Sequence, residues 1–173
     1  PGYAINTYKL VRYAGVDPDD GAPQYYDVDG KTITKDYSAS NAVLLSGKSP
    51  DPKWYGGFTT DVSYKGLALT IDLNYNFGMY TFNYNKETLV SWGDQVYINQ
   101  STEALNHWKS PGDKTLLPKP SPDNVTYDTD LYLQNSSFVR LRNVILSYTL
   151  PQNLSRKFKA ENFRVYLQGT NLL

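Results

Sequence analysis

The most regular pattern of apolar and polar side chains lies between Leu67 and Met79. Large apolar residues occupy every odd position of this run, and small or polar residues occupy every even position. A period of two residues is typical of a β-strand with two chemically different faces. At ~3.3 Å per residue the run is roughly 43 Å long, well beyond an ordinary strand. Tilted as in membrane barrels, such a strand is long enough to cross a hydrocarbon core.

Three further runs alternate in the same way. Phe58–Tyr64 precedes the long strand and is separated from it by Lys65-Gly66 alone, which predicts an antiparallel hairpin. Ser137–Leu150 is a second long strand whose apolar positions change phase near Asn143, so we expect either a β-bulge there or a strand that leaves the membrane. Asn162–Thr170 is the last predicted strand.

The N-terminal part of the chain predicts shorter elements. Tyr3–Ala14 is rich in β-forming residues, and we expect one strand there. Asp29-Gly30 separates two short β-forming arms, 24–28 and 31–34, and this dipeptide predicts a small hairpin outside any membrane.

The segment from 80 to 136 is interrupted by prolines and predicts a long irregular loop. One short helix is expected between Ser101 and Trp108, with Ser101 as its N-cap. Tyr80, Phe82 and Tyr84 alternate with polar residues at the start of this segment. They are where we expect the aromatic girdle of a membrane barrel.

The connections between the predicted strands alternate in length. Residues 15–56 and 80–136 form long connections, whereas 65–66 and 151–161 form short ones. Antiparallel strands collect the short turns on one rim and the long loops on the other, as in bacterial outer-membrane barrels. About five strands cannot close such a barrel. The sequence therefore predicts an all-β fold, an antiparallel up-and-down segment of a larger transmembrane β-barrel with long extracellular loops.

Composition and motif content argue against several classes of function for this fold. Seventeen basic and seventeen acidic residues balance, so no overall charge favours nucleic acid. The chain has no Cys and one His, His107, which predicts no metal site. The acidic turn at Asp17–Asp20 lacks the later glutamate of a calcium loop and is interpreted as a turn. With no nucleophile–base pair and no phosphate-binding loop, we expect no enzyme, no catalytic residue and no cofactor.

Several motifs of the chain resemble one family in the same order. Residues 137–151, S-F-V-R-L-R-N-V-I-L-S-Y-T-L-P, resemble the late S-F-L-R-L-K-N-V-T-L-S-Y-T-L-P signature of SusC/RagA-type TonB-linked outer-membrane proteins. Residues 164–172 are similar to the family's R-V-Y-x-x-G-x-N-L strand. The G-x-D-P-x-x-G, D-G-K and G-G-F…Y-K-G elements have counterparts at 15–21, 29–31 and 56–66. The resemblance extends over essentially the whole chain.

This resemblance implies a barrel of about 22 strands, plugged by an N-terminal domain and covered outside by a SusD-like lipoprotein. It implies TonB-driven import of oligosaccharides or peptides across the outer membrane of a Gram-negative, Bacteroidetes-like cell. Residues 1–173 then correspond to a partial, C-terminal barrel segment, without the plug, the TonB-contacting segment or the last closing strands. The implied partners are the lipoprotein, TonB, the substrate and outer-membrane lipid. The short connections at 65–66 and 151–161 would lie in the periplasm, and 80–136 outside.

Polar residues on the strands are the candidates for the lumen of this barrel. They are Asp72, Asn74, Asn76, Arg164 and Gln168. A solvated channel wall is the favoured interpretation, and specific contact with substrate is the other. The alternative function is a soluble β-sandwich that binds carbohydrate through Trp54, Trp92, Trp108 and loop tyrosines, because aromatic rings stack on sugars.

Overall fold

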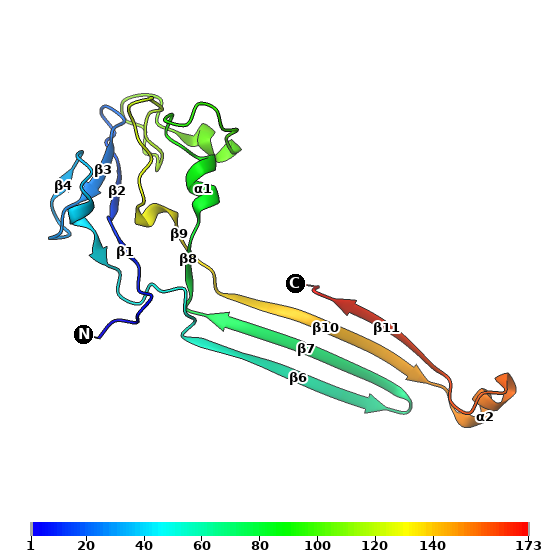
Figure 1. Cartoon of the computed structure of the whole chain (residues 1–173). Helices are drawn as coiled ribbons and strands as arrows, with labels where there is room; N and C mark the ends of the chain where they lie inside the picture. Colours follow the sequence, from blue (N-terminus) through cyan, green and yellow to red (C-terminus); the bar gives the residue numbers. More distant parts are fainter. Residues whose placement is uncertain (1, 173) are drawn as a thin grey trace. The chain divides into compact units, whose positions relative to one another are not determined.

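The computed structural model describes residues 2–172. The contacts within the chain divide it into two compact units. The loop unit contains Pro1–Asp51 and Tyr80–Asn135, and the sheet unit contains Pro52–Met79 and Ser136–Leu173. Each unit is described in turn, with its elements labelled as in Figure 1.

The sheet unit is built from four strands in the order β11-β10-β7-β6, and every neighbouring pair is antiparallel. The strands are β6 (Trp54–Tyr64), β7 (Leu67–Phe77), β10 (Phe138–Thr149) and β11 (Arg164–Thr170) (Figure 1). Neighbours in the sheet follow one another along the chain, apart from the long insertion between β7 and β10. This up-and-down order confirms the predicted strand arrangement.

A two-residue turn joins β6 to β7, as the sequence predicts. Lys65 and Gly66 both have positive φ angles, 47° and 88°. Two positive φ values define the type I′ turn, whose twist matches that of an antiparallel hairpin. A Cβ at Gly66 would lie 2.6 Å from the carbonyl oxygen of Thr149, so the turn packs tightly against β10.

The phase change in the second long strand is a β-bulge. Leu141 pairs with Leu73 and Asn143 pairs with the adjacent Asp72, so Arg142 is the extra residue of β10. The bulge keeps Leu141 on the same face as Val144, which pairs with Ile71. An insertion of one residue is what reverses the alternation in the sequence, and the bulge prediction is confirmed.

Two short helical elements that the sequence did not indicate join β10 to β11. They are α2 (Gln152–Ser155) and η4 (Arg156–Phe158). Lys159 ends this turn in the left-handed conformation, with φ 55°. The connection remains short, so the alternation of short turns and long loops holds.

The loop unit contains short strands and helices among irregular segments. Its strands are β1 (Lys9–Leu10), β2 (Tyr13–Val16), β3 (Pro23–Tyr26), β4 (Ile33–Thr34), β5 (Val43–Leu44), β8 (Tyr80–Phe82) and β9 (Leu133–Asn135). Its helices are α1 (Tyr84–Leu89), η1 (Ala39–Asn41), η2 (Thr102–Asn106) and η3 (Asp130–Tyr132). The strands pair as β1-β5, β2-β3-β4 and β8-β9.

Two adjoining hydrophobic clusters form the core of the loop unit. Trp92 and Tyr25 pack with Val11 in one cluster, and Tyr132 and Val90 pack with Phe82 in the other. Leu117 and Leu131 contact both clusters. Long irregular segments therefore bury an aromatic core here instead of lying loosely on a surface.

The N-terminal predictions have mixed outcomes. The hairpin around Asp29-Gly30 is confirmed as β3–β4, and the Asp29 carboxylate accepts hydrogen bonds from the backbone N–H groups of Lys31 and Thr32. A single strand at 3–14 is wrong, because β1 and β2 join two different sheets of the loop unit. The poor alternation of this segment agrees with that interruption.

The predictions for the segment after Met79 also have mixed outcomes. The Ser101 hydroxyl caps η2 by accepting from the Glu103 N–H, as predicted, although η2 is a 3-10 helix. Of the aromatic girdle expected at Tyr80, Phe82 and Tyr84, the assignment of Phe82 is wrong, because this side chain is buried against Tyr132 in the loop unit. Between residues 2 and 172, none of the helices is long and apolar enough to cross a membrane.

Candidate functional site

The strand register places the five predicted polar residues on one face of the sheet unit. Asp72 lies between Thr59 and Asn143 on the neighbouring strands, and Asn74 lies between Gly57 and Arg140. The remaining three have these neighbours: Asn76 pairs with Tyr55 and Phe138, Arg164 with Thr149, and Gln168 with Ile145. Asn76 and Arg164 lie at opposite ends of β10, so the five residues spread along a surface and do not meet at one point.

Cross-strand hydrogen bonds connect the polar groups of this face. The Thr59 hydroxyl donates to Asp72, and on the next rung the Thr70 hydroxyl donates to Asp61, so the Thr/Asp pairs alternate in direction. Paired polar side chains hold one another in place on a sheet surface. An ordered hydrophilic wall follows from this arrangement.

Hydrogen bonds between β10 and β11 extend this wall. Gln168 Nε2 donates to Asn143 Oδ1 at 3.0 Å, and Arg164 Nη2 donates to Ser147 Oγ at 2.7 Å. Ile145 is an apolar residue among them. The polar face thus runs across all four strands of the sheet unit.

Sequence reasoning missed two charged residues of the polar face. Asp61 lies within the alternating run Phe58–Tyr64, but only the register shows that it neighbours Thr70. Arg140 precedes the bulge, and its guanidinium lies 4.3 Å from the centre of the Phe138 ring. The alternation before Asn143 was the sequence signal that could have placed Arg140 on the polar face, once the bulge is taken into account.

The opposite face of the sheet unit is predominantly apolar, with Thr60 as a polar residue beside Ile71. Its middle rungs pair Val62 with Leu69, and Leu146 with both Leu69 and Leu167. Leu167 is 75% exposed in spite of its apolar side chain. A contiguous exposed apolar surface of this kind marks a region that contacts lipid or another protein.

Aromatic residues lie at both ends of the apolar face. Tyr64 and Tyr148 flank Leu67 beside the β6–β7 turn. Trp54 pairs with Phe77 at the other end, and the Tyr75 ring stacks on Phe77. Tyr75 also covers Gly56 on β6, where an added Cβ would lie 2.8 Å from the tyrosine hydroxyl. Aliphatic residues between two aromatic borders are the pattern of a lipid-facing barrel surface.

Two cavities lie among the described residues of the loop unit, 2–51 and 80–135. The larger has a volume of about 740 Å³ and is lined by Lys86, Glu103, His107 and Lys114, among others. Lys86 and Glu103 form an ion pair across it at 2.8 Å. The second, of about 280 Å³, lies beside Trp92. The His107 Nδ1 atom lies 2.9 Å from the Ala104 carbonyl oxygen, which fixes the ring on the wall between them.

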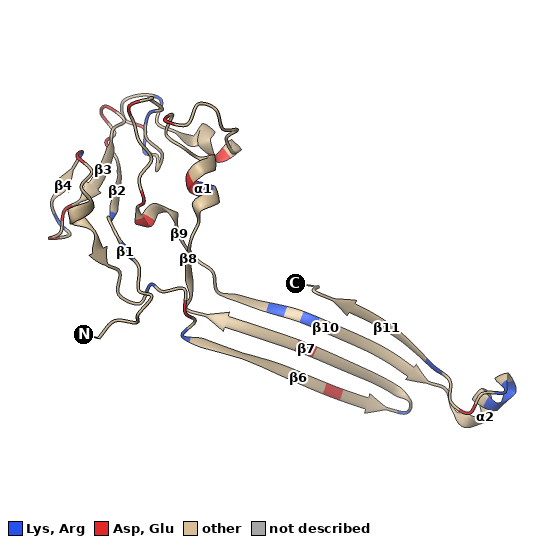
Figure 2. Ribbon diagram, viewed as in Figure 1, with Lys and Arg blue, Asp and Glu red and all other residues tan. Residues whose placement is uncertain are grey.

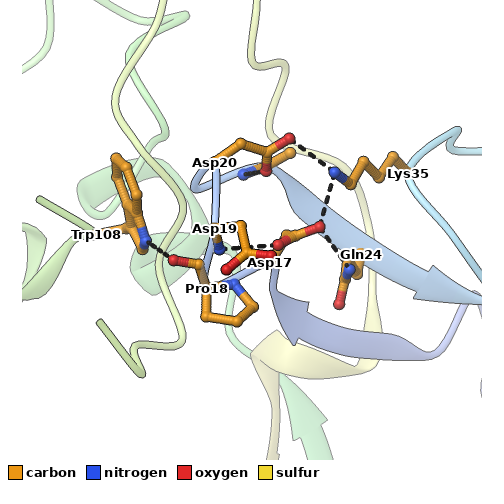
Figure 3. Close-up of polar contacts among 8 residues, drawn as sticks. Asp17, Pro18, Asp19, Asp20, Gln24, Lys35 and Trp108 are labelled. Carbon is orange, nitrogen blue, oxygen red and sulfur yellow. Dashed lines mark hydrogen bonds and ion pairs between the residues drawn. The ribbon is translucent and has the colours of Figure 1, made fainter. Parts of the chain in front are cut away.

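The acidic turn at 17–20 is held by a lysine (Figure 3). Lys35 Nζ lies 2.7 Å from carboxylate oxygens of both Asp17 and Asp20. These hydrogen bonds lower the pKa of each carboxyl group and raise the pKa of the lysine. Trp108 Nε1 donates to the Pro18 carbonyl at 3.1 Å. The carboxylates are engaged by donors of the chain itself, in agreement with a structural turn.

The three tryptophans do not form a common surface. Trp92 and Trp108 are 2% and 7% exposed in the loop unit, whereas Trp54 is 74% exposed in the sheet unit. A ring that stacks on sugar must present a free face. The alternative of a carbohydrate-binding sandwich built on these residues is therefore not supported.

Comparison with known proteins agrees with this geometry. No protein-family model matches the chain. A TonB-dependent receptor of Formosa agariphila is 27% identical over 99% of the chain and 18% of that protein. The TonB-dependent receptor SusC of Bacteroides thetaiotaomicron is 28% identical over 98% of the chain and 16% of that protein. The chain thus spans less than a fifth of the length of these relatives.

A solved structure shows the same fold. The RagAB peptide transporter superposes with a TM-score of 0.83 and 32% identity, over 96% of this chain and 19% of the matched chain. These relatives are named as receptors and transporters rather than as enzymes. The fold and its two faces define an all-β segment of a TonB-dependent barrel. Within that class, the chain is a segment of the SusC/RagA type.

Proposed function

We propose that this chain supplies part of the wall and of the extracellular loops of an outer-membrane TonB-dependent transporter. The observation that carries the proposal is the sheet unit, whose one face is predominantly apolar with aromatic ends and whose other face is hydrogen-bonded and polar. Such a sheet has lipid on one side and water on the other. The edges of the sheet, β6 and β11, pair with further strands of the barrel, because lipid does not tolerate unpaired backbone groups.

The transporter imports large nutrients, oligosaccharides or peptides, across the outer membrane of a Gram-negative, Bacteroidetes-like cell. A SusD-like surface lipoprotein and TonB are its partners, the latter through another part of the receptor. Support comes from the SusC relative and from the RagAB structure, which is named as a peptide transporter. The loop unit, with its own core, forms the extracellular side where substrate and lipoprotein arrive.

The polar face lines the lumen in this proposal. Asp72, Asn74, Asn76, Arg164 and Gln168 then form a solvated wall. Their spread along the face, and the hydrogen bonds of Asp72, Arg164 and Gln168 to neighbouring strands, support a wall more than a single binding point. The absence of Cys from the chain simplifies a direct test.

The test uses single cysteines in the full-length receptor, made free of other reactive thiols and reconstituted into liposomes. Leu69→Cys, Ile71→Cys and Leu73→Cys probe the apolar face, and Thr70→Cys, Asp72→Cys and Asn74→Cys probe the polar face. A nitroxide label on each reports contact with water or with lipid. We expect lipid contact at 69, 71 and 73 and water contact at 70, 72 and 74. The reverse pattern, or water at all six positions, would overturn the proposal.

A further inference from the structure

A group of cations lies at the rim of the sheet unit that carries the short turns. It consists of Lys65 in the β6–β7 turn and Arg156, Lys157 and Lys159 in the connection from β10 to β11. All four are exposed, and Figure 2 shows basic residues gathered in the helical connection around α2. We call these four residues the basic rim.

Between residues 2 and 172, none of the ion pairs found involves the basic rim. These ion pairs involve Lys35 and Lys86, which belong to the loop unit. Glu161 is the acidic residue of the β10–β11 connection, and it leaves this rim with a net positive charge. Unpaired cations held close together favour an anionic ligand from outside the chain.

Apolar side chains adjoin these cations. Phe158 is exposed between Lys157 and Lys159, and its ring stacks on Phe163 at 5.9 Å between centroids. Tyr64 is exposed beside the turn, and Lys65 Nζ lies 5.1 Å from the centre of its ring. A layer of aromatic rings bordered by cations is the composition of a membrane–water boundary.

A shallow groove at this rim provides donors for a phosphate group. It has a volume of about 430 Å³ and is lined by Arg156, Lys159, Gln152 and Asn162, together with Glu161 and Ala160. A guanidinium binds phosphate with two parallel hydrogen bonds, and an ammonium group adds a point charge. Glu161 is the one acidic group that opposes this arrangement.

From these observations we propose that the basic rim binds the phosphate groups of phospholipids in the membrane leaflet on the short-turn side. The inference rests on the proposed function, in which the apolar face lies in lipid. Headgroup phosphates fit better than a soluble anion because Tyr64, Tyr148 and Phe158 would lie in the adjoining acyl layer while the cations reach the headgroups. The rim would thus set the depth of the sheet in the membrane and retain anionic lipid around it.

The test measures lipid selectivity of the full-length receptor in nanodiscs of mixed phosphatidylglycerol and phosphatidylcholine. Native mass spectrometry of the released receptor counts the lipids that remain bound. The rim variant carries Arg156→Gln, Lys157→Gln and Lys159→Gln. The control variant carries Lys109→Gln, Lys114→Gln and Lys119→Gln, which removes three exposed lysines of the loop unit.

We expect the receptor to retain phosphatidylglycerol in preference to phosphatidylcholine, and the rim variant to lose this preference by roughly a hundredfold, since each of the three cations removed contributes ~1 kcal/mol near an anionic surface. The control variant should keep the preference. Glu161→Gln should strengthen the preference for phosphatidylglycerol. This variant provides a second test if the triple substitution impairs folding. Excess inorganic phosphate should leave the bound lipid in place.

The outcomes of this experiment distinguish a failure of the lipid-binding inference from a failure of the proposed function on which it rests. If the receptor inserts in the bilayer and the rim variant retains the full preference, the inference is wrong while the transporter proposal stands. Equal losses in the rim and control variants, or displacement by inorganic phosphate, would also overturn it. A receptor that fails to insert in either lipid would instead contradict the proposed function.

Discussion

The loop unit and the sheet unit differ in where their apolar side chains lie: the loop unit buries them, and the sheet unit exposes them. Every large hydrophobic residue found buried between residues 2 and 172 belongs to the loop unit, including Trp92 and Tyr132. The sheet unit instead leaves its apolar face exposed, from Phe58 on β6 to Leu167 on β11. A unit in water must bury its own apolar groups, whereas a unit in lipid has a solvent that accepts them. This difference fits the proposed function, in which the loop unit lies in water and the sheet unit lies in lipid.

The two units also differ in charge, although the chain as a whole is neutral. The sheet unit has eight Lys/Arg and three Asp/Glu, and the loop unit has nine and fourteen. Their net charges are therefore +5 and −5. The neutral charge of the whole chain conceals this difference in net charge between the two units. The acidic loop unit favours hydration, and the basic residues of the sheet unit include those of the short-turn rim.

The largest expected effect tests whether the loop unit depends on its own core. Trp92→Ala should destabilise this unit by about 3–5 kcal/mol, because it removes a large buried side chain. Hydrogen exchange of the full-length receptor, followed by mass spectrometry, should show faster exchange at 80–135 and unchanged exchange at 67–77. Tyr97→Ala, at an aromatic residue that is 99% exposed in the same unit, is the control and should change stability by less than about 0.5 kcal/mol. Equal effects of the two substitutions would refute the assigned core.

The next effect tests the two faces of the sheet unit. Ile71→Arg places a charge in the middle of the apolar face and should cost about 2–4 kcal/mol of folding free energy in a bilayer. Thr70→Arg introduces the same side chain on the polar face beside Asp61. It loses one hydrogen bond and should cost only about 0.5–1.5 kcal/mol. Urea unfolding of the receptor in lipid vesicles measures both, and a similar cost at both sites would contradict the assigned faces.

The sheet unit could be predicted closely from the sequence because its determinants are local. Alternation over β7 fixed the two faces, Lys65-Gly66 fixed the turn, and the phase change at Asn143 located the bulge. What the sequence could not provide was register. The pairing of Asp61 with Thr70, and the neighbourhood of Arg140 and Asn74, depend on which residues of separate strands lie opposite.

The loop unit was predicted poorly because its determinants are non-local. The irregular stretch after Met79 alternates only at its start, up to Tyr84, yet Phe82 and Tyr132 meet in one cluster although they are far apart in the sequence. The short helix α1 was missed, since six residues give too little pattern to recognise. Phe82 was assigned to a membrane girdle because alternation alone does not tell a lipid-facing residue from a buried one.

A smaller effect tests the tight packing of the hairpin turn in the sheet unit. Gly66→Ala requires an L-residue at positive φ and also brings a Cβ within 2.6 Å of the Thr149 carbonyl oxygen. Gly112→Ala is a matched control in the loop unit, because Gly112 also has positive φ but nothing lies within 4 Å of the added atom. We expect Gly66→Ala to lower the free energy of unfolding by about 1 kcal/mol more than Gly112→Ala does, because β10 must shift to accommodate the added atom. Chemical unfolding of each variant measures the difference, and equal costs would show that the turn is loosely packed.

The smallest effect is a pH dependence confined to the loop unit. Burial, followed by the hydrogen bond to Asp128 and the charges of Asp128 and Asp94, raises the pKa of Glu87 on α1 to about 7. An unfolded glutamate titrates near about 4.3. The folded state therefore binds this proton more tightly, so its contribution to stability is complete below about 4.3 and is lost as the pH rises through about 7.

Because solvent partly screens the half-buried Glu87 carboxyl group, we expect a loss of only about 1 kcal/mol between acidic and mildly basic pH. Hydrogen exchange at 84–89 and 126–130, corrected for the intrinsic effect of pH on exchange, measures this loss. Glu87→Gln keeps a neutral side chain at every pH and should abolish the dependence. Glu103→Gln removes a carboxylate that pairs with Lys86 in the same unit and should leave the dependence in place. If Glu87→Gln also preserved it, the proton would belong to another group, and the contrast between an acidic loop unit in water and a sheet unit in lipid would lose its pH signature.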